Sequence, residues 1–97
     1  MTKKKTADFK RNEIDNLAQN KPSVYKILNR NGKNIYTGSS KRGQLKNRIK
    51  DHLPGGSDPI PGGTKVKIKQ YNRIKDAKES EKRIISQSKP KYNKKGK

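Results

Sequence analysis

The apolar residues of this chain recur with two different periods, and these separate predicted helices from predicted strands. A spacing of three to four residues places apolar side chains on one face of a helix, whereas strict alternation is typical of a half-buried strand. A Lys-Pro pair ends both the first and the last helical stretch, because the residue before proline disfavours helical geometry. By these rules we predict helices over residues 7–20, 44–53 and 73–88, and strands over residues 23–29, 34–38 and 64–70.

The first two predicted strands are expected to form a β-hairpin. An Asn-Gly pair at 31–32 stands between them, and this dipeptide is a strong signal for a two-residue turn. In that register Ile27 lies opposite Tyr36, and Tyr25 lies opposite Gly38. Because residues two apart on a strand share a face, all four side-chain positions point the same way. The two tyrosines then become diagonal neighbours.

The order of elements, α-β-β-α-β-α, predicts an α/β domain of the α+β type. We expect a small three-stranded antiparallel sheet flanked by about three helices. Residues 54–63 hold three prolines and four glycines, which predicts a loop that either contacts substrate or merely connects two elements. A chain of 97 residues has room for one domain. We expect that domain at residues 7–93, between a disordered basic tail at 1–6 and a second basic tail at 94–97.

The charge balance indicates a polyanionic partner. Lysine and arginine number 27 against 8 aspartates and glutamates, which gives a net charge of +19. Such a chain repels itself unless its charge is neutralised, and phosphate neutralisation with counterion release is the main source of non-specific affinity for nucleic acid. We therefore expect nucleic acid as the partner. We favour DNA over RNA, but the charge itself does not distinguish the two. A solvated lysine-rich surface is the plainer alternative.

Several classes of site are excluded by the residues that the chain lacks. It has no cysteine and one histidine, His52, so thiolate zinc sites, disulfides, cysteine nucleophiles and multi-histidine metal clusters are all excluded. No apolar run follows the basic N-terminus, so neither a signal peptide nor a membrane span is expected. We expect a cytoplasmic protein without a small-molecule cofactor.

The last predicted helix carries a carboxylate among its apolar positions. Glu81 falls within the stripe formed by Ile74, Ala77, Ile84 and Ile85. A carboxylate on a buried helix face is costly unless it is paired or holds a metal. Two interpretations stay open: a salt bridge to a nearby lysine or arginine, or a ligand for a hard divalent cation such as Mg²⁺.

Four further side chains could take part in chemistry. Arg48 and His52 are four residues apart on the second predicted helix and project from one side. The arginine could grip a phosphate with its planar guanidinium group, although a solvated helix flank would look the same. Tyr25 and Tyr36 could be packing residues of the sheet, or phenols that orient or deprotonate a water.

In combination these residues resemble the GIY-YIG nuclease family. The resemblance rests on Pro22-Ser23-Val24-Tyr25, Ile35-Tyr36-Thr37-Gly38, Arg48 with His52, Glu81, and Lys89-Pro90-Lys91-Tyr92-Asn93. The end of this pattern is similar to the incision domain of bacterial excision-repair nucleases. Three positions depart from the family motifs: Ser23 replaces a glycine, and Val24 and Thr37 replace isoleucines. A lysine often follows the second motif, whereas here Ser39-Ser40 precede Lys41.

The resemblance implies a metal-dependent endonuclease, using Mg²⁺ or Mn²⁺, that leaves 5′-phosphate and 3′-hydroxyl ends. One of the paired tyrosines would assist the attacking water, with Tyr25 preferred, and a lowered tyrosine pKa would be needed for that role. The implied catalytic residues are Tyr25, Tyr36, Arg48, His52, Glu81 as the sole metal carboxylate, and Asn93 as a supporting polar group. The predicted contacts to nucleic acid are Lys41, Arg42, Lys46 and Arg48.

Two alternatives remain at this point. A non-catalytic basic binding protein would explain the charge, but it would not explain Glu81 or the ordered series of tyrosines, arginine and glutamate. A restriction-type nuclease would use Asp76-Ala77-Lys78 with Asp58 upstream, but that signature requires a strand where the pattern predicts a helix. Since a catalytic domain alone is expected, sequence selectivity should be modest, and the oligomeric state stays open.

Overall fold

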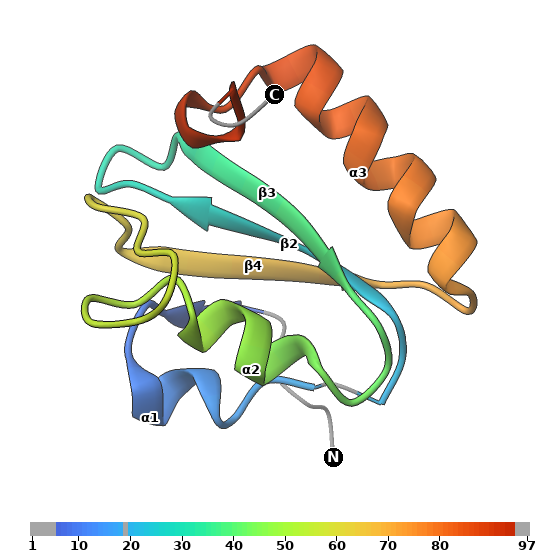
Figure 1. Cartoon of the computed structure of the whole chain (residues 1–97), viewed down its shortest axis with the longest axis horizontal. Coiled ribbons are helices and arrows are strands. Elements are labelled where there is room, and N and C mark those ends of the chain that lie inside the picture. Colours follow the sequence, from blue (N-terminus) through green and yellow to red (C-terminus); the bar gives the residue numbers. More distant parts are fainter. Residues whose placement is uncertain (1–5, 19, 95–97) are drawn as a thin grey trace.

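A four-stranded antiparallel sheet forms the centre of the fold, with strand order β1-β4-β2-β3 (Figure 1). The structure is a computed structural model, and it describes residues 6–18 and 20–94. The strands are β1 (Thr6–Asp8), β2 (Ser23–Leu28), β3 (Asn34–Ser40) and β4 (Lys65–Gln70). Because β3 is last in this order, it is an edge strand with one free side.

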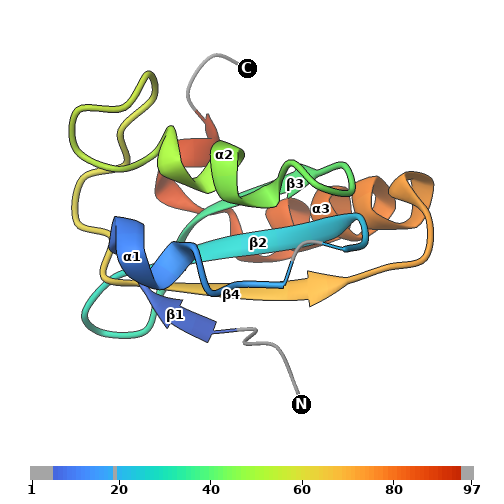
Figure 2. The ribbon, with the colours of Figure 1, turned by 90° about the horizontal axis from the view of Figure 1, so that it is seen from below.

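The helices lie in two groups around the sheet (Figures 1 and 2). They are α1 (Arg11–Ile14), α2 (Leu45–Lys50) and α3 (Ile74–Ser88), followed by the short 3₁₀ helix η1 (Lys91–Lys94). α3 packs against β2 and β3, whereas α2 packs against α1 and β3. Within the described residues, no helix has the length and apolar character that crossing a membrane requires.

The predicted fold class is confirmed, but the sheet has four strands rather than three. The fourth strand is β1, which pairs with β4 through Ala7 opposite Val66. The predicted helix over 7–20 is therefore wrong. One helical turn forms there, and a tighter turn follows it. These two turns already bury Ile14 and the apolar residues after it, so a longer helix is not needed. Of the predicted tails, residues 1–5 and 95–97 lie outside the described residues, Thr6 belongs to β1, and residue 94 belongs to η1.

The predicted hairpin register is confirmed, although the turn is longer than expected. Ile27 lies opposite Tyr36, and Tyr25 lies opposite Gly38. Residues 30–32 form a three-residue loop instead of a two-residue turn. A bulge just after Ile27 shifts the register by one residue and offsets the extra loop residue. The tyrosine positions are therefore those that the shorter turn predicts.

The second helix is shorter than predicted, yet its apolar stripe is buried as expected. α2 ends at Lys50, and the chain continues through tight turns in which the His52 amide donates to the Ile49 carbonyl at 2.9 Å. Leu45, Ile49 and Leu53 are all buried. His52 thus projects from a turn beyond the helix, while Arg48 lies on the helix itself. The remaining elements, β4 and α3, begin one residue later than predicted.

The two faces of the sheet carry different cores. Tyr25 and Ile27 belong to the main apolar cluster, together with residues of α1, α2 and the loop after α2. Val24 is also buried but points to the opposite face, where α3 packs. Since β3 is the edge strand, side chains from both faces can meet beyond its free side.

Candidate active site

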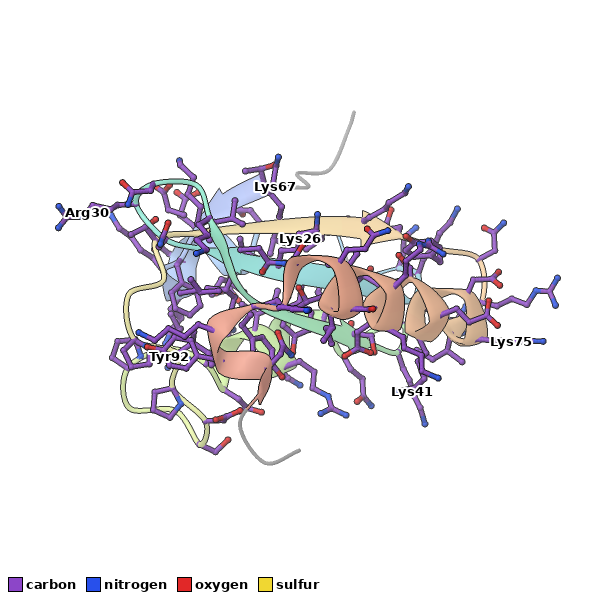
Figure 3. All side chains as sticks on the ribbon, turned by 90° about the horizontal axis from the view of Figure 1, so that it is seen from above. Lys26, Arg30, Lys41, Lys67, Lys75 and Tyr92 are labelled. Carbon is purple, nitrogen blue, oxygen red and sulfur yellow. The ribbon has the colours of Figure 1, made fainter. Side chains whose placement is uncertain are left out.

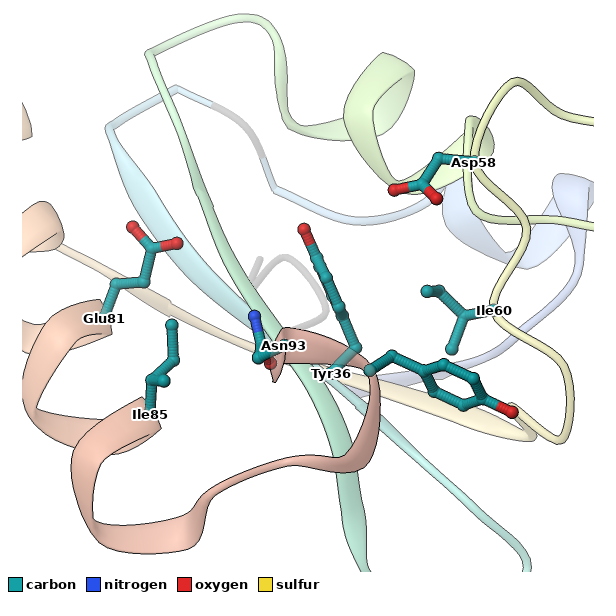
Figure 4. A pocket seen from close by; sticks show the side chains of 7 residues that line it. Tyr36, Asp58, Ile60, Glu81, Ile85 and Asn93 are labelled. Carbon is teal, nitrogen blue, oxygen red and sulfur yellow. The ribbon is translucent and has the colours of Figure 1, made fainter. Parts of the chain in front are cut away.

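Two hollows that share Tyr36 and Asp58, here together called the catalytic hollow, bring together the six residues predicted to be catalytic beside the free edge of β3. One part, of about 230 Å³, is lined by Tyr25, Tyr36, Arg48, Asp51, His52, Ser57 and Asp58. The other, of about 310 Å³, is lined by Tyr36, Asp58, Ile60, Glu81, Ile85, Tyr92 and Asn93. Figure 4 shows the Tyr36 ring between Glu81 and Asp58. The residues come from β2, β3, α2, the following loop, α3 and η1, so the site exists only when both ends of the domain are in place.

Tyr25 is hydrogen-bonded to the single histidine. Its hydroxyl lies 3.0 Å from His52 Nε2, and both side chains are buried, with 3% and 5% of their surface exposed. On the other side of the ring, Nδ1 lies 2.8 Å from the backbone carbonyl oxygen of Asp58. A carbonyl oxygen can only accept, so Nδ1 carries the ring proton and Nε2 of the neutral ring is an acceptor. The Tyr25 hydroxyl therefore donates to His52.

The glycine of the second motif makes room for the Tyr25 phenol. A Cβ atom at Gly38 would lie 2.5 Å from both Cζ and Oη of Tyr25, which is far inside van der Waals contact. Gly38 is directly opposite Tyr25 in the strand pairing, so the phenol lies across its backbone. Glycine is required at position 38 for a steric reason: any side chain there would displace the Tyr25 hydroxyl.

The protein environment raises the pKa of both tyrosines. Burial is the main cause for Tyr25, with a smaller contribution from Tyr36 and an opposing one from Arg48. Burial also raises the pKa of Tyr36, and the carboxylates of Asp58 and Glu81 add to the effect. The lowered tyrosine pKa that the proposed role requires is therefore not produced by these side chains. Desolvation raises the pKa of each tyrosine by more than the Arg48 guanidinium lowers it. Both tyrosine hydroxyls are therefore protonated at neutral pH.

Glu81 is half-buried and hydrogen-bonded to a serine. Ser39 Oγ donates to Glu81 Oε1 at 2.7 Å. The carboxylate forms no ion pair with any lysine or arginine of the described chain, which disfavours the salt-bridge interpretation. The fully buried polar residue of α3 is instead Ser80, which is hydrogen-bonded to Tyr71. Glu81 lies at the border of the apolar stripe, where its second oxygen is available to the hollow.

The donor set suits a hard divalent cation held by few protein ligands. In the described part of the chain, no three histidine, cysteine, aspartate or glutamate side chains are grouped so as to hold a metal. A cation at Glu81 would therefore complete its coordination mainly with water and substrate oxygens. Mg²⁺ binds in this way, retaining several waters and using one or two carboxylates. The site fits Mg²⁺ and does not resemble a closed zinc site.

Asn93 is tied to the edge of β3 rather than to the substrate side of the hollow. Its Oδ1 accepts the Thr37 amide at 2.7 Å, and its Nδ2 donates to the Thr37 carbonyl at 2.9 Å. The side-chain amide therefore replaces a neighbouring strand at this residue. This contact fixes η1 against β3, which is consistent with the supporting role predicted for Asn93.

The predicted basic contacts divide into two groups. Lys41 and Arg42 are exposed in the turn between β3 and α2, and Arg48 is exposed while lining the hollow. Lys46 instead lies towards α1, where it contributes with Lys50 to a lowered pKa of Asp15, the hydrogen bond from Lys50 being the larger cause. Lys46 is thus less well placed for nucleic acid than the other three.

Two residues that contact the predicted site residues were not themselves predicted to belong to this site: Asp58, which lines the hollow, and Ser39, which lies behind Glu81. Asp58 lies in the loop after α2, and its backbone carbonyl fixes the His52 tautomer while its carboxylate oxygen Oδ2 lies 3.7 Å from Nδ1. Ser39 follows the second motif and orients Glu81. A loop aspartate has no periodicity to reveal its direction, whereas alternation along β3 could have placed Ser39 on the face of α3. The loop at 54–63 is therefore a wall of the site as well as a connector.

The restriction-type alternative is wrong. Asp76-Ala77-Lys78 lies within the regular helix α3, with Ala77 buried and Lys78 exposed. These residues point in different directions, and none of them lines a hollow with Asp58.

Comparisons with known proteins agree with this geometry. A family model described as the GIY-YIG catalytic domain matches residues 21–93. Crystal structures of the GIY-YIG N-terminal endonuclease domain of UvrC from Thermotoga maritima are similar to this chain. An asparagine-to-alanine mutant bound to its catalytic divalent cation has a TM-score of 0.67 at 27% identity, covering 84% of this chain and 91% of that one. The form bound to magnesium has a TM-score of 0.62 at 28% identity, covering 84% and 92%.

A comparison with curated proteins gives no match. The family model and the solved structures nevertheless agree with each other, and together they confirm the resemblance that the sequence motifs indicate.

Proposed function

The chain belongs to the GIY-YIG family and is a nuclease catalytic domain, and from that premise we propose that it hydrolyses phosphodiesters of DNA, leaving 5′-phosphate and 3′-hydroxyl ends. The observation that carries the proposal is the meeting of two phenols, an imidazole, a guanidinium and a carboxylate at one edge of the sheet. The basic charge supports a polyanionic substrate, and the likeness to a repair-nuclease domain supports DNA over RNA.

Tyr25 is the better placed of the two phenols to take a proton from the attacking water. Its own proton is directed at His52 Nε2, so its oxygen lone pairs can accept a hydrogen bond from a water in the hollow. As the water attacks phosphorus, its proton passes to the Tyr25 oxygen and the phenolic proton passes to His52. This path explains how a tyrosine with a raised pKa can act as a base, because no phenolate has to exist beforehand.

The new imidazolium would be stabilised by the Asp58 side of the ring. The carbonyl oxygen at 2.8 Å already accepts the Nδ1 proton, and the carboxylate oxygen at 3.7 Å contributes negative charge. Tyr36, whose ring centroid lies 4.6 Å from that of His52, borders both parts of the hollow. We assign it to positioning of the water and the phosphate rather than to proton removal.

Arg48 and Glu81 flank the position of the reacting phosphate. The Arg48 guanidinium would hold the non-bridging oxygens, whose negative charge grows in the transition state. Glu81 would hold Mg²⁺ or Mn²⁺ through the oxygen that Ser39 leaves available. When bound there, the cation supplies charge stabilisation for the departing 3′ oxygen.

Replacing Glu81 by glutamine tests the proposal. We expect Glu81→Gln to lower Mg²⁺-dependent cleavage of labelled duplex DNA by at least about 100-fold, while binding to the same DNA in EDTA persists. Glu79→Gln is the matched control, because it removes the same charge from an exposed position on the same helix. Equal cleavage by both variants would refute the role of Glu81. Cleavage of RNA but not DNA would refute the substrate assignment.

A further inference from the structure

A row of lysines crosses the sheet face beside α3. On β4, the exposed residues Lys65, Lys67 and Lys69 alternate with buried apolar residues, so the three lysines share one face. Lys67 lies directly opposite Lys26 of β2. α3 packs against β2 and β3, and the β4 lysines remain exposed next to it.

Three of these lysines have no compensating carboxylate. Lys65 is paired with Asp8 at 3.3 Å, whereas Lys26, Lys67 and Lys69, here called the lysine face, form no ion pair with any residue that the structure describes. Like charges directly opposite on neighbouring strands destabilise a sheet. Threonine or glutamine would maintain the polar alternation without that cost, so the arrangement favours a ligand that supplies negative charge.

The lysine face and the catalytic hollow lie on two sides of α3. The three lysines line a hollow of about 190 Å³ together with Ile84, while the next residue, Ile85, lines the catalytic hollow. Figure 3 shows labelled members of the lysine face on one side of α3 and Lys41 on the other. The exposed Lys78 and Lys82 of α3 line a further hollow with Glu81 and Ile85, next to the catalytic hollow.

We propose that the lysine face is a second phosphate-binding surface, which holds the backbone of the nucleic-acid substrate outside the segment that is cut. The proposal rests on the proposed function only for the identity of the polyanion. One nucleic-acid molecule would contact the lysine face, pass over the lysines of α3 and enter the catalytic hollow with another segment. The phosphates of the held segment would then neutralise the opposed lysines.

The test is the salt dependence of binding by a variant with Lys26, Lys67 and Lys69 all replaced by glutamine. Binding to a 30-base-pair duplex is measured in EDTA, where no hydrolysis is needed. The slope of log K against log salt is negative, and losing three phosphate contacts should make it less steep by about 2.7. Between 50 and 200 mM salt, the unaltered protein should therefore lose about 40-fold more affinity than the variant.

A second triple variant controls for the loss of net charge. Lys10, Lys21 and Lys33 are exposed and lie in three separate connections of the chain. Replacing all three by glutamine removes the same total charge without touching the lysine face. We expect this variant to change the slope by less than about 1. Equal slopes for the two triple variants would overturn the proposal.

Substrate length and thermal unfolding complete the test. In Mg²⁺, the lysine-face variant should lose cleavage efficiency on the long duplex but cut a duplex of a few base pairs as the unaltered protein does. Its midpoint of unfolding should equal or exceed that of the unaltered protein, since an opposed pair of like charges is removed. Equal losses on both lengths would overturn the proposal, as would a defect seen only with anionic lipid vesicles. Failure of the unaltered protein to cut DNA would instead refute the proposed function.

Discussion

Replacing Gly38 by alanine tests whether the position of one phenol controls cleavage. The new Cβ would lie 2.5 Å from Cζ and Oη of Tyr25, whereas carbon contacts are comfortable at about 3.5 Å. The ring must therefore retreat by about 1 Å, which is enough to weaken or break its 3.0 Å hydrogen bond to His52. Because the ring is buried, overpacking should destabilise the fold by about 1–3 kcal/mol. A misplacement of about 1 Å can lower the rate about 100-fold.

The assay compares cleavage rates at saturating substrate with the free energy of unfolding in urea. Gly32→Ala is the control for stability, because Gly32 has a φ of 81° and no atom within 4 Å of the added Cβ. That variant should lose about 1 kcal/mol from backbone strain and keep the cleavage rate. If Gly38→Ala remains folded and cuts at the unaltered rate, the position of Tyr25 does not control the reaction.

Three further predictions concern the same hollow. Ser39→Ala should weaken Mg²⁺ binding, measured by calorimetry without substrate, by about 10- to 100-fold. Ser39→Thr keeps the hydroxyl and should retain the Mg²⁺ affinity of the unaltered protein. Unchanged Mg²⁺ affinity in Ser39→Ala would refute the orienting role of Ser39. His52→Ala should lower cleavage by at least about 100-fold and be partly rescued by added imidazole, whereas a fully active variant would exclude the proton path. Because burial raises the pKa of Tyr25 and of the partly buried Tyr36, the free energy of unfolding should be fully retained below about pH 10 and fall above it. The buried Tyr25 should contribute a loss of up to about 1.4 kcal/mol per pH unit, and the partly exposed Tyr36 less. Tyr25→Phe should make the alkaline loss shallower in urea unfolding.

The site could be predicted from sequence because most of its residues lie on regular elements. Alternation along the hairpin placed Tyr25 and Tyr36 on one face, and the register that an Asn-Gly turn implies is the one observed. The helical period predicts Glu81 within the apolar stripe, and the structure has it half-buried at the border of that stripe. The spacing of Arg48 and His52 predicts one side of one helix, and both line the hollow although His52 lies beyond the end of α2. Local periodicity and the family motifs were sufficient for these residues.

Features without a local period could not be predicted. The segment at 7–20 was expected to be a helix because the apolar spacing of Ile14 and its neighbours satisfies one helical turn, and a three-residue strand leaves no alternation long enough to detect. Asp58 reaches the hollow through a loop whose path depends on contacts with His52. Sequence also gave no sign that burial would raise the tyrosine pKa values, since desolvation depends on the packed structure.

The pairing of Asn93 with Thr37 has a consequence for assembly. An unpaired edge strand can recruit a strand from another molecule and so lead to aggregation. Here the Asn93 side chain already occupies both backbone groups of Thr37, so a second molecule cannot extend the sheet through that residue. The Asn93 side-chain amide thus blocks intermolecular strand addition at the edge of β3, and no further strand is needed to cover that edge.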